Sequence, residues 1–129
     1  MFSRKKQPPI RSLIGEGARI EGPMHFSDGL RIDGVVHGDI RAETGKPSLL
    51  VISETAQVHG EIHAWHVIVN GSVHGPVFAT TLLELQPKAR IEGDVHYAAL
   101  EMHQGATIAG QLYPSSEEKP ALRLAASNV

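Results

Sequence analysis

Histidines offer the most chemistry in this 129-residue chain, and three of its eight lie in the same tripeptide, Val-His-Gly, at His37, His59 and His74. Neutral imidazole is a frequent zinc ligand. Carboxylates follow two of these histidines at a spacing of two residues, as Asp39 and Glu61. If the fold stacks the three tripeptides, their side chains form either a metal-binding ladder or a solvated row of polar residues on β-strands.

Other signatures of catalysis or cofactor binding are missing from the sequence. The chain has no cysteine, which excludes disulfides and thiolate metal sites. It contains no Gly-x-Ser-x-Gly nucleophile motif, no Gly-x-Gly-x-x-Gly turn and no phosphate-binding loop. Its net charge of −2 gives no general attraction to nucleic acid. We therefore predict a protein that is not an enzyme and that uses no cofactor, nucleotide or nucleic acid.

The Val-His-Gly tripeptides belong to a longer internal repeat. Residues 30–40, LRIDGVVHGDI, are almost copied at 67–77, VIVNGSVHGPV, and the second half of the pattern, Ile/Val-x-Gly-x-apolar, occurs four more times. Its glycines are 15 to 18 residues apart, except for one step of 22 residues that contains the turn-like insertion RAETGKPSL (41–49). The six repeat glycines are Gly22, Gly38, Gly60, Gly75, Gly93 and Gly110.

Between these glycines the apolar residues alternate with period two, as in Leu30-x-Ile32, Leu50-x-Ile52 and Leu83-x-Leu85. That periodicity predicts β-strands, and no window sustains the i, i+3, i+4, i+7 stripe of a helix. Short strands broken by glycine in units of about 17 residues favour a parallel β-helix, in which each unit is one coil with apolar side chains in the bore. About six coils spaced ~4.8 Å apart form a rod roughly 29 Å long.

The same alternation predicts outward-facing columns of side chains that run along the rod. The residue before each repeat glycine stacks in one column, which consists of Glu21, His37, His59, His74, Glu92 and Ala109. The next two columns are Pro23, Asp39, Glu61, Pro76, Asp94 and Gln111, and then His25, Arg41, His63, Phe78, His96 and Tyr113. Because glutamate, alanine and proline share these columns with histidine, we favour a solvated ladder over a metal site.

Two kinds of corner precede the repeat glycines. Four units have an alanine four residues before the glycine, at Ala18, Ala56, Ala89 and Ala106. The other two units are shorter by two residues and carry Asp33-Gly34 or Asn70-Gly71 instead. Because Asp-Gly and Asn-Gly accept a positive φ at little cost, we expect tighter corners of that kind there.

The glycine-punctuated coils of residues 12–113, together with short flanking tails and a start of MFSRKK, resemble a bactofilin. Bactofilins are bacterial cytoskeletal proteins, and the resemblance implies a right-handed parallel β-helix that polymerises into filaments without nucleotide. It also implies a scaffold for cell shape that places peptidoglycan-modifying enzymes or other cell-shape proteins. The residues that resemble a membrane-targeting segment are Met1, Phe2, Ser3, Arg4, Lys5 and Lys6.

We divide the chain into a tail at 1–11, a β-helix domain at 12–113 and a tail at 114–129. Both tails are rich in polar, charged or proline residues, and we expect them to be disordered. The first tail lacks the apolar segment of a secretory signal, and no run of 18 apolar residues is present to span a membrane. We therefore expect a cytoplasmic protein whose N-terminal residues bind anionic lipid at the inner face of the cytoplasmic membrane.

A β-helix exposes backbone groups and an apolar cross-section at each end unless a cap covers them. The sequence shows no evident cap, so we predict that the ends stack on further copies of the chain; the alternative is that the tails fold over them. The residues predicted to form this polymer interface are Leu13, Ile14, Ile20 and Met24 in the first coil and Leu100, Met102, Ile108 and Leu112 in the last.

A left-handed β-helix enzyme is the main alternative. IGEGARIEG (14–22) satisfies the loose hexapeptide pattern of trimeric acyltransferases and gamma-class carbonic anhydrases. Those proteins need a strict six-residue step around the whole coil, which repeat steps of 15, 16, 17 and 22 residues do not keep. We therefore prefer the filament-forming scaffold.

Overall fold

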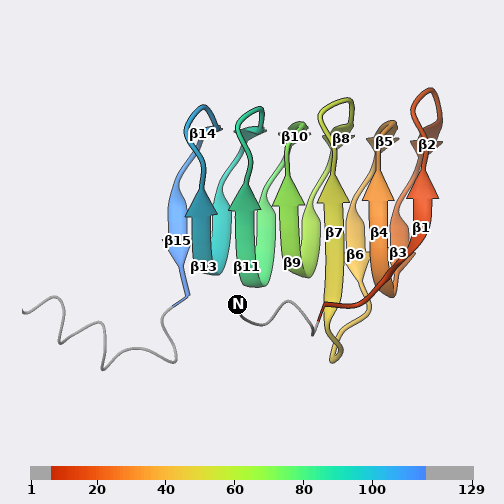
Figure 1. The fold of residues 1–129 in the computed structure, drawn as a ribbon, viewed down its shortest axis with the longest axis horizontal. Helices are drawn as coiled ribbons and strands as arrows, with labels where there is room; N and C mark the ends of the chain where they lie inside the picture. Colours follow the sequence, from red (N-terminus) through yellow and green to blue (C-terminus); the bar gives the residue numbers. More distant parts are fainter. Residues whose placement is uncertain (1–6, 116–129) are drawn as a thin grey trace, which may run out of the picture.

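The computed structural model describes residues 7–115, and within them every regular element is a β-strand (Figure 1). None of these residues forms a helix with the length and apolar character needed to cross a bilayer. In chain order the strands are β1 (Ile10–Ile14), β2 (Arg19–Glu21), β3 (Met24–Phe26), β4 (Asp28–Ile32), β5 (Val35–His37), β6 (Ile40–Ala42), β7 (Ser48–Ile52), β8 (Gln57–His59), β9 (Ile62–Val69), β10 (Ser72–His74), β11 (Val77–Leu85), β12 (Arg90–Glu92), β13 (Val95–Met102), β14 (Thr107–Ala109) and β15 (Leu112–Pro114).

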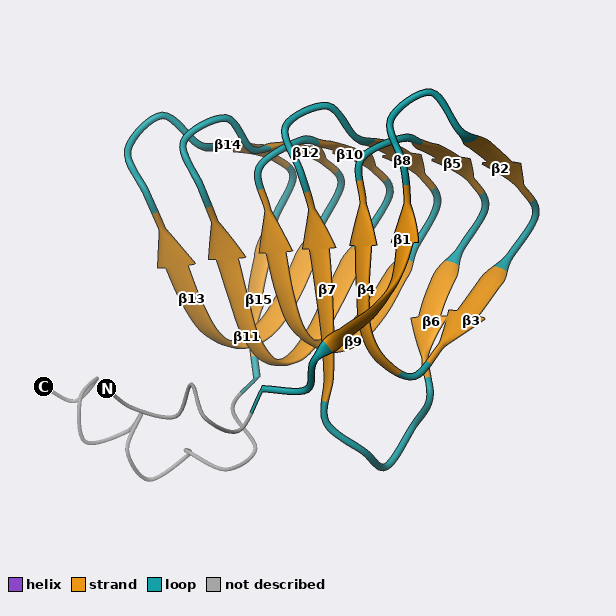
Figure 2. Cartoon of the chain, turned by 45° about the vertical axis from the view of Figure 1, so that its right-hand side comes forward, coloured by secondary structure: helices purple, strands orange, loops and turns teal. Residues whose placement is uncertain are grey.

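The strands form about six coils of a solenoid with a front, an upper and a rear face (Figures 1 and 2). The upper sheet has the order β2-β5-β8-β10-β12-β14, and the other sheet has the order β1-β4-β7-β9-β11-β13-β15 with β3 and β6 beside it. Every pairing is parallel. The long strands β9, β11 and β13 bend from the rear face to the front face, so each contributes to two coils (Figure 2).

The direction of winding follows from Figure 1. The chain runs upward along the front face, crosses the upper face toward the rear and returns to the front, and each new coil lies to the left of the previous one. This winding is right-handed, as the family resemblance implies. The left-handed enzyme is therefore the wrong alternative.

The bore holds the side chains that the period-two pattern assigned to it. Leu30 is 1% exposed, and Ile32, Leu50 and Leu83 are 0% exposed. The parallel register places equivalent positions of successive coils side by side, which gives one apolar column of Leu30, Leu50, Val67, Leu83 and Leu100. Each coil thus buries the apolar face of its neighbour, which a single coil cannot do alone.

Glycine is required at the corner between the upper and rear faces, which we call the glycine corner. Gly38, Gly60, Gly75 and Gly93 have φ values between 147° and 155°, a region that L side chains rarely adopt. A Cβ at any of them would also collide with the carbonyl group of the equivalent glycine one coil earlier. These residues therefore let the backbones of successive coils approach at sheet spacing.

The two short corners use glycine for a different reason from the predicted one. Neither Gly34 nor Gly71 has a positive φ. A Cβ on Gly34 would instead lie 2.5 Å from the carbonyl oxygens of Gly15 and Ala18, and a Cβ on Gly71 would collide with the carbonyl oxygen of Ser53. Close approach of two corners, rather than a left-handed backbone, requires glycine there.

The first strand begins before the predicted boundary of the β-helix. Ile10 pairs with Gly29, and Arg11 forms an ion pair with Asp28 at 3.1 Å. Ile10 and Arg11 thus belong to the first coil and not to a disordered tail, because the next coil supplies both with partners. The rest of the predicted tails, residues 1–6 and 116–129, lies outside the described residues, and so does the whole expected membrane-targeting segment.

Candidate self-assembly surfaces and the histidine columns

The three Val-His-Gly histidines stack on one another on the upper face. Strand pairing places His37 beside His59 and His59 beside His74. Their ring centroids lie 4.6 and 4.8 Å apart, with interplanar angles of 13° and 6°. Glu21 and Glu92 occupy the same column on either side. The first predicted column is therefore confirmed.

Position within the column decides the electrostatics of each member. Burial and the neighbouring His37, His74 and Arg19 lower the pKa of His59 below its ordinary value. Both effects disfavour a charged ring. At one side of the column Arg19 donates a 2.7 Å hydrogen bond to Glu21, which lowers the pKa of that carboxyl group.

The stacked histidines do not form a convergent metal site. Parallel rings one coil apart direct their nitrogens side by side, whereas tetrahedral zinc needs ligands that converge on one point at about 2 Å. Within residues 7–115, the group whose ligand atoms all lie within 4.8 Å of one another is instead Glu84, Glu101 and His103.

That cluster lies on the front face near the last coil, and sequence reasoning missed it. Glu84 pairs directly with Glu101, and His103 Nε2 lies 3.3 Å from Glu101 Oε2. His66 Nε2 is 3.7 Å from Glu84 Oε1 on the other side. The one-coil spacing of Glu84 and Glu101 is the signal that was available. Since Glu101 and His103 are exposed and already form an ion pair, we assign the cluster no ligand.

The predicted column on the rear face is also confirmed, and part of it is a continuous ring stack. His63 and Phe78 lie 4.4 Å apart between centroids, Phe78 and His96 4.4 Å, and His96 and Tyr113 4.7 Å. Arg41 precedes this stack in the same column, and its Nη2 atom lies 3.4 Å from Glu61 Oε1. The stack ends in the last coil at Tyr113, which is 42% exposed.

The first coil leaves its inward side chains incompletely covered within the described residues. Ile14, Ile20 and Met24 face the bore and are only partly buried. Their partners one coil further in are 0% exposed; these are Ile32, Val36 and Ile40. Among residues 7–115 no strand pairs with the outer sides of β1, β2 and β3.

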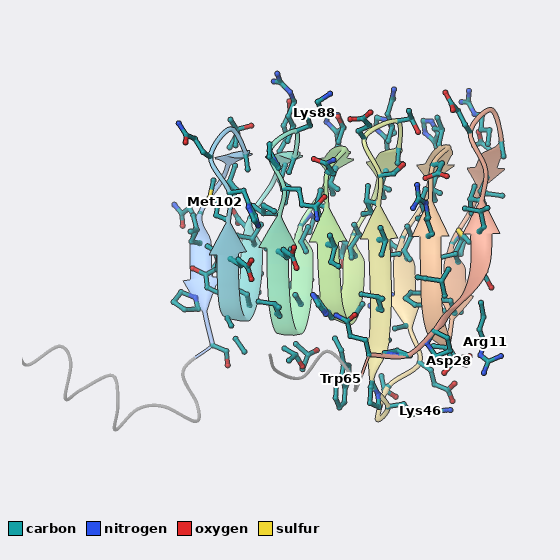
Figure 3. The ribbon with its side chains drawn as sticks, in the orientation of Figure 1. Arg11, Asp28, Lys46, Trp65, Lys88 and Met102 are labelled. Atoms are coloured by element: carbon teal, nitrogen blue, oxygen red, sulfur yellow. The ribbon has the colours of Figure 1, made fainter. Side chains whose placement is uncertain are left out.

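The last coil repeats this arrangement at the other end of the rod. Met102 and Leu112 are 46% and 45% exposed, whereas Leu85 and Val95, their partners in the preceding coil, are 0% exposed. Figure 3 shows Met102 at this end of the solenoid. Leu100 and Ile108 also face the bore and are partly buried. Both ends thus present an apolar cross-section bordered by strand edges, which is a surface suited to another β-helix end.

Leu13 is the predicted interface residue that does not belong to this cross-section. It pairs with Arg31 on the outer side of the front face and is 58% exposed. Ser12 and Ile14 point inward instead, because their register partners are Leu30 and Ile32. Leu13 therefore lies at the rim of the first coil.

Comparison with known proteins gives the same picture. A family model for bactofilins, described as polymer-forming cytoskeletal, matches residues 12–113. The chain is 25% identical to Bactofilin BacO of Myxococcus xanthus (strain DK1622) over 118 residues, which cover 92% of this chain and 90% of that protein. No solved structure is significantly similar to this chain. A solenoid with two uncovered apolar ends and a family match over its whole length lead to one conclusion: this chain belongs to the bactofilin family of polymer-forming cytoskeletal proteins.

Proposed function

We propose that this protein assembles end to end into filaments, without nucleotide, through the cross-sections of its first and last coils. The observation that carries the proposal is the contrast in exposure between Leu112, at 45%, and its partner Val95, at 0%. Stacking a second solenoid on either end continues the strand ladders and removes these apolar side chains from water. The family's polymer-forming character supports the same function.

The filament acts at the inner face of the cytoplasmic membrane, as a scaffold for cell shape that places peptidoglycan-modifying enzymes. The support for this part comes from residues 1–6. Phe2 is suited to burial at a bilayer interface, and Arg4, Lys5 and Lys6 are suited to anionic lipid. The scaffold itself needs no catalytic group.

A charge placed in the end cross-section tests the assembly. Ile108→Arg or Leu112→Arg puts a cation between stacked coils, and an unpaired buried charge destabilises such a contact by several kcal/mol. We expect electron microscopy without added nucleotide to show filaments for the wild type, and both variants to sediment as small species with unchanged strand signal in circular dichroism.

The matched control is Gln57→Arg, which adds the same charge at an exposed position on β8 in the middle of the rod. This variant should form filaments like those of the wild type. Filaments of normal length in Ile108→Arg and Leu112→Arg would show that the ends are not the interface.

A further inference from the structure

The residues before β1 form an arm that crosses the solenoid instead of leaving from its end. Pro9 lies against Gly29, where a Cβ would come within 2.5 Å of the Pro9 carbonyl oxygen. Two residues earlier, the Gln7 Nε2 atom lies 2.8 Å from His66 Nδ1, a distance typical of a hydrogen bond. Gly29, Leu49 and His66 are register partners in successive coils. The arm therefore spans three coils, and Leu49 beneath it is only 6% exposed.

This path fixes where the N-terminal residues start. Gln7 is held beside His66, next to Trp65 at the corner where the rear face turns into the front face. We call this the lower corner; it consists of Ser27, residues 43–47, Trp65, residues 80–81 and Ala98, and Figure 3 shows Trp65 and Lys46 along it. Phe2 is five residues from Gln7, so an extended chain carries it no further than about 18 Å from that point.

So short a connection makes the charge of the nearby surface important. Residues 7–115 contain seven Lys or Arg and twelve Asp or Glu, a formal charge of −5. The solenoid is thus repelled by an anionic surface, although residues 1–6 carry three cationic side chains. A bilayer that binds residues 1–6 therefore favours whichever side of the solenoid has the fewest unpaired carboxylates.

The lower corner is that side. Its two carboxylates, Asp28 beside the corner and Glu43 within it, form ion pairs with Arg11 at 3.1 Å and Lys46 at 3.9 Å. Figure 3 shows the first pair near this edge. The other positions of the corner are uncharged, and one of them is the single tryptophan of the chain. By contrast, the strand ends and loops that flank the glycine corner carry Glu21, Asp39, Glu61, Glu92 and Asp94.

We infer that the lower corner is the side of the solenoid that faces an anionic bilayer, with Trp65 at the lipid–water interface. This inference rests on the proposed membrane association and adds an orientation to it. Tryptophan suits that position because its ring is apolar and its N–H group stays near water. The upper face and the glycine corner, with their histidine column, then face away from the lipid.

Trp65 provides the test, because no other tryptophan contributes to the fluorescence. The full-length protein is mixed with phosphatidylglycerol-rich vesicles that contain brominated lipid, and binding is followed in parallel by co-sedimentation. We expect the bound protein to show quenched and blue-shifted Trp65 emission relative to protein in solution.

Two single-carboxylate variants supply the matched comparison. Thr81→Glu adds a charge on the lower corner, and Gln57→Glu adds the same charge on the upper face; both positions are exposed. One charge near an anionic surface contributes roughly 1 kcal/mol, so Thr81→Glu should bind at least about fivefold more weakly than Gln57→Glu. Wild-type binding with unquenched Trp65, or equal binding by the two variants, overturns the orientation and leaves membrane association standing. If the wild type does not bind at all, both proposals fail.

Discussion

At the scale of single residues, three imidazole rings stacked 4.6 to 4.8 Å apart are compatible as neutral groups but not as three cations. Glu92 Oε1 lies 3.1 Å from His74 Nδ1 and offsets part of the charge on one side. His59 has an imidazole above and below it and Arg19 nearby, and its pKa is lowered accordingly. The column is therefore tolerated at neutral pH and opposed by acid.

The first prediction concerns pH. Because the pKa of His59 is lower in the folded state, the unfolded chain binds more protons near the ordinary histidine pKa. Stability should thus fall as the pH drops through about 6.5. Glu21 and Asp33 also have lowered pKa values, but their contribution is lost only below their ordinary values of 4.5 and 3.8. A decrease in the free energy of unfolding between pH 7.5 and 5.5 would therefore come from histidine.

Urea denaturation of the Ile108→Arg variant measures this without interference from polymerisation. His59→Gln in the same background should flatten the dependence between pH 7.5 and 5.5. His103→Gln, which removes a histidine outside the column, should leave the part that arises from the column unchanged. An identical slope with and without His59 would contradict the explanation.

At the scale of strands and corners, the sequence predicts most of what the structure contains. Period-two alternation identified the inward residues such as Leu50 and Leu83, and counting from the repeat glycines identified the outward columns. Both succeed because a parallel solenoid keeps equivalent positions in register, so that one repeat predicts the others. The twenty-two-residue step was correctly assigned to a loop, which lies between β6 and β7.

What the sequence could not predict depends on contacts between distant parts of the backbone. The short corners at Gly34 and Gly71 were assigned to a positive φ, because local propensity says nothing of the carbonyl groups one coil away. The arm was also missed: Pro8-Pro9 suggested a disordered tail, yet Gly29 leaves space for it and Gln7 reaches His66. Neither contact has a local sequence signal.

The second prediction separates these two uses of glycine. In Gly34→Ala the new methyl group meets the carbonyl oxygens of Gly15 and Ala18, and overpacking of this kind destabilises a protein by about 1–3 kcal/mol. Gly15→Ala is the matched control, since a Cβ there has no atom within 4 Å. Urea denaturation should show the loss for Gly34→Ala and a change within about 1 kcal/mol for Gly15→Ala. Equal stability of the two variants would contradict the close-approach explanation.

At the scale of the whole molecule, assembly and membrane binding are expected to depend on each other. Phe2 contributes roughly 2–3 kcal/mol if buried at a bilayer interface, and three cationic side chains contribute about 1 kcal/mol each before ordering costs are subtracted. A single N-terminal segment of about 5 kcal/mol is a millimolar-class anchor. A filament presents many such segments, whose binding is strengthened by their effective concentration.

The third prediction follows from this difference. Wild-type protein should co-sediment with anionic vesicles, whereas Phe2→Ala and the double variant Lys5→Ser/Lys6→Ser should stay largely in solution. The Ile108→Arg variant keeps an intact N-terminus but should also stay in solution, because it presents one segment at a time. Equal sedimentation of Ile108→Arg and wild type would show that avidity is not required.

The parallel pairing of every coil also determines how such a rod responds to force. Its backbone hydrogen bonds between coils point along the rod, since the strands run across it. Tension along a filament therefore pulls directly on these bonds, with ladders on three faces sharing the load at each level. Inside a subunit, the covalent corners and buried side chains such as Val95 also hold adjacent coils together. A junction between subunits lacks the covalent corners, so a stretched filament should break there and leave intact subunits that reassemble.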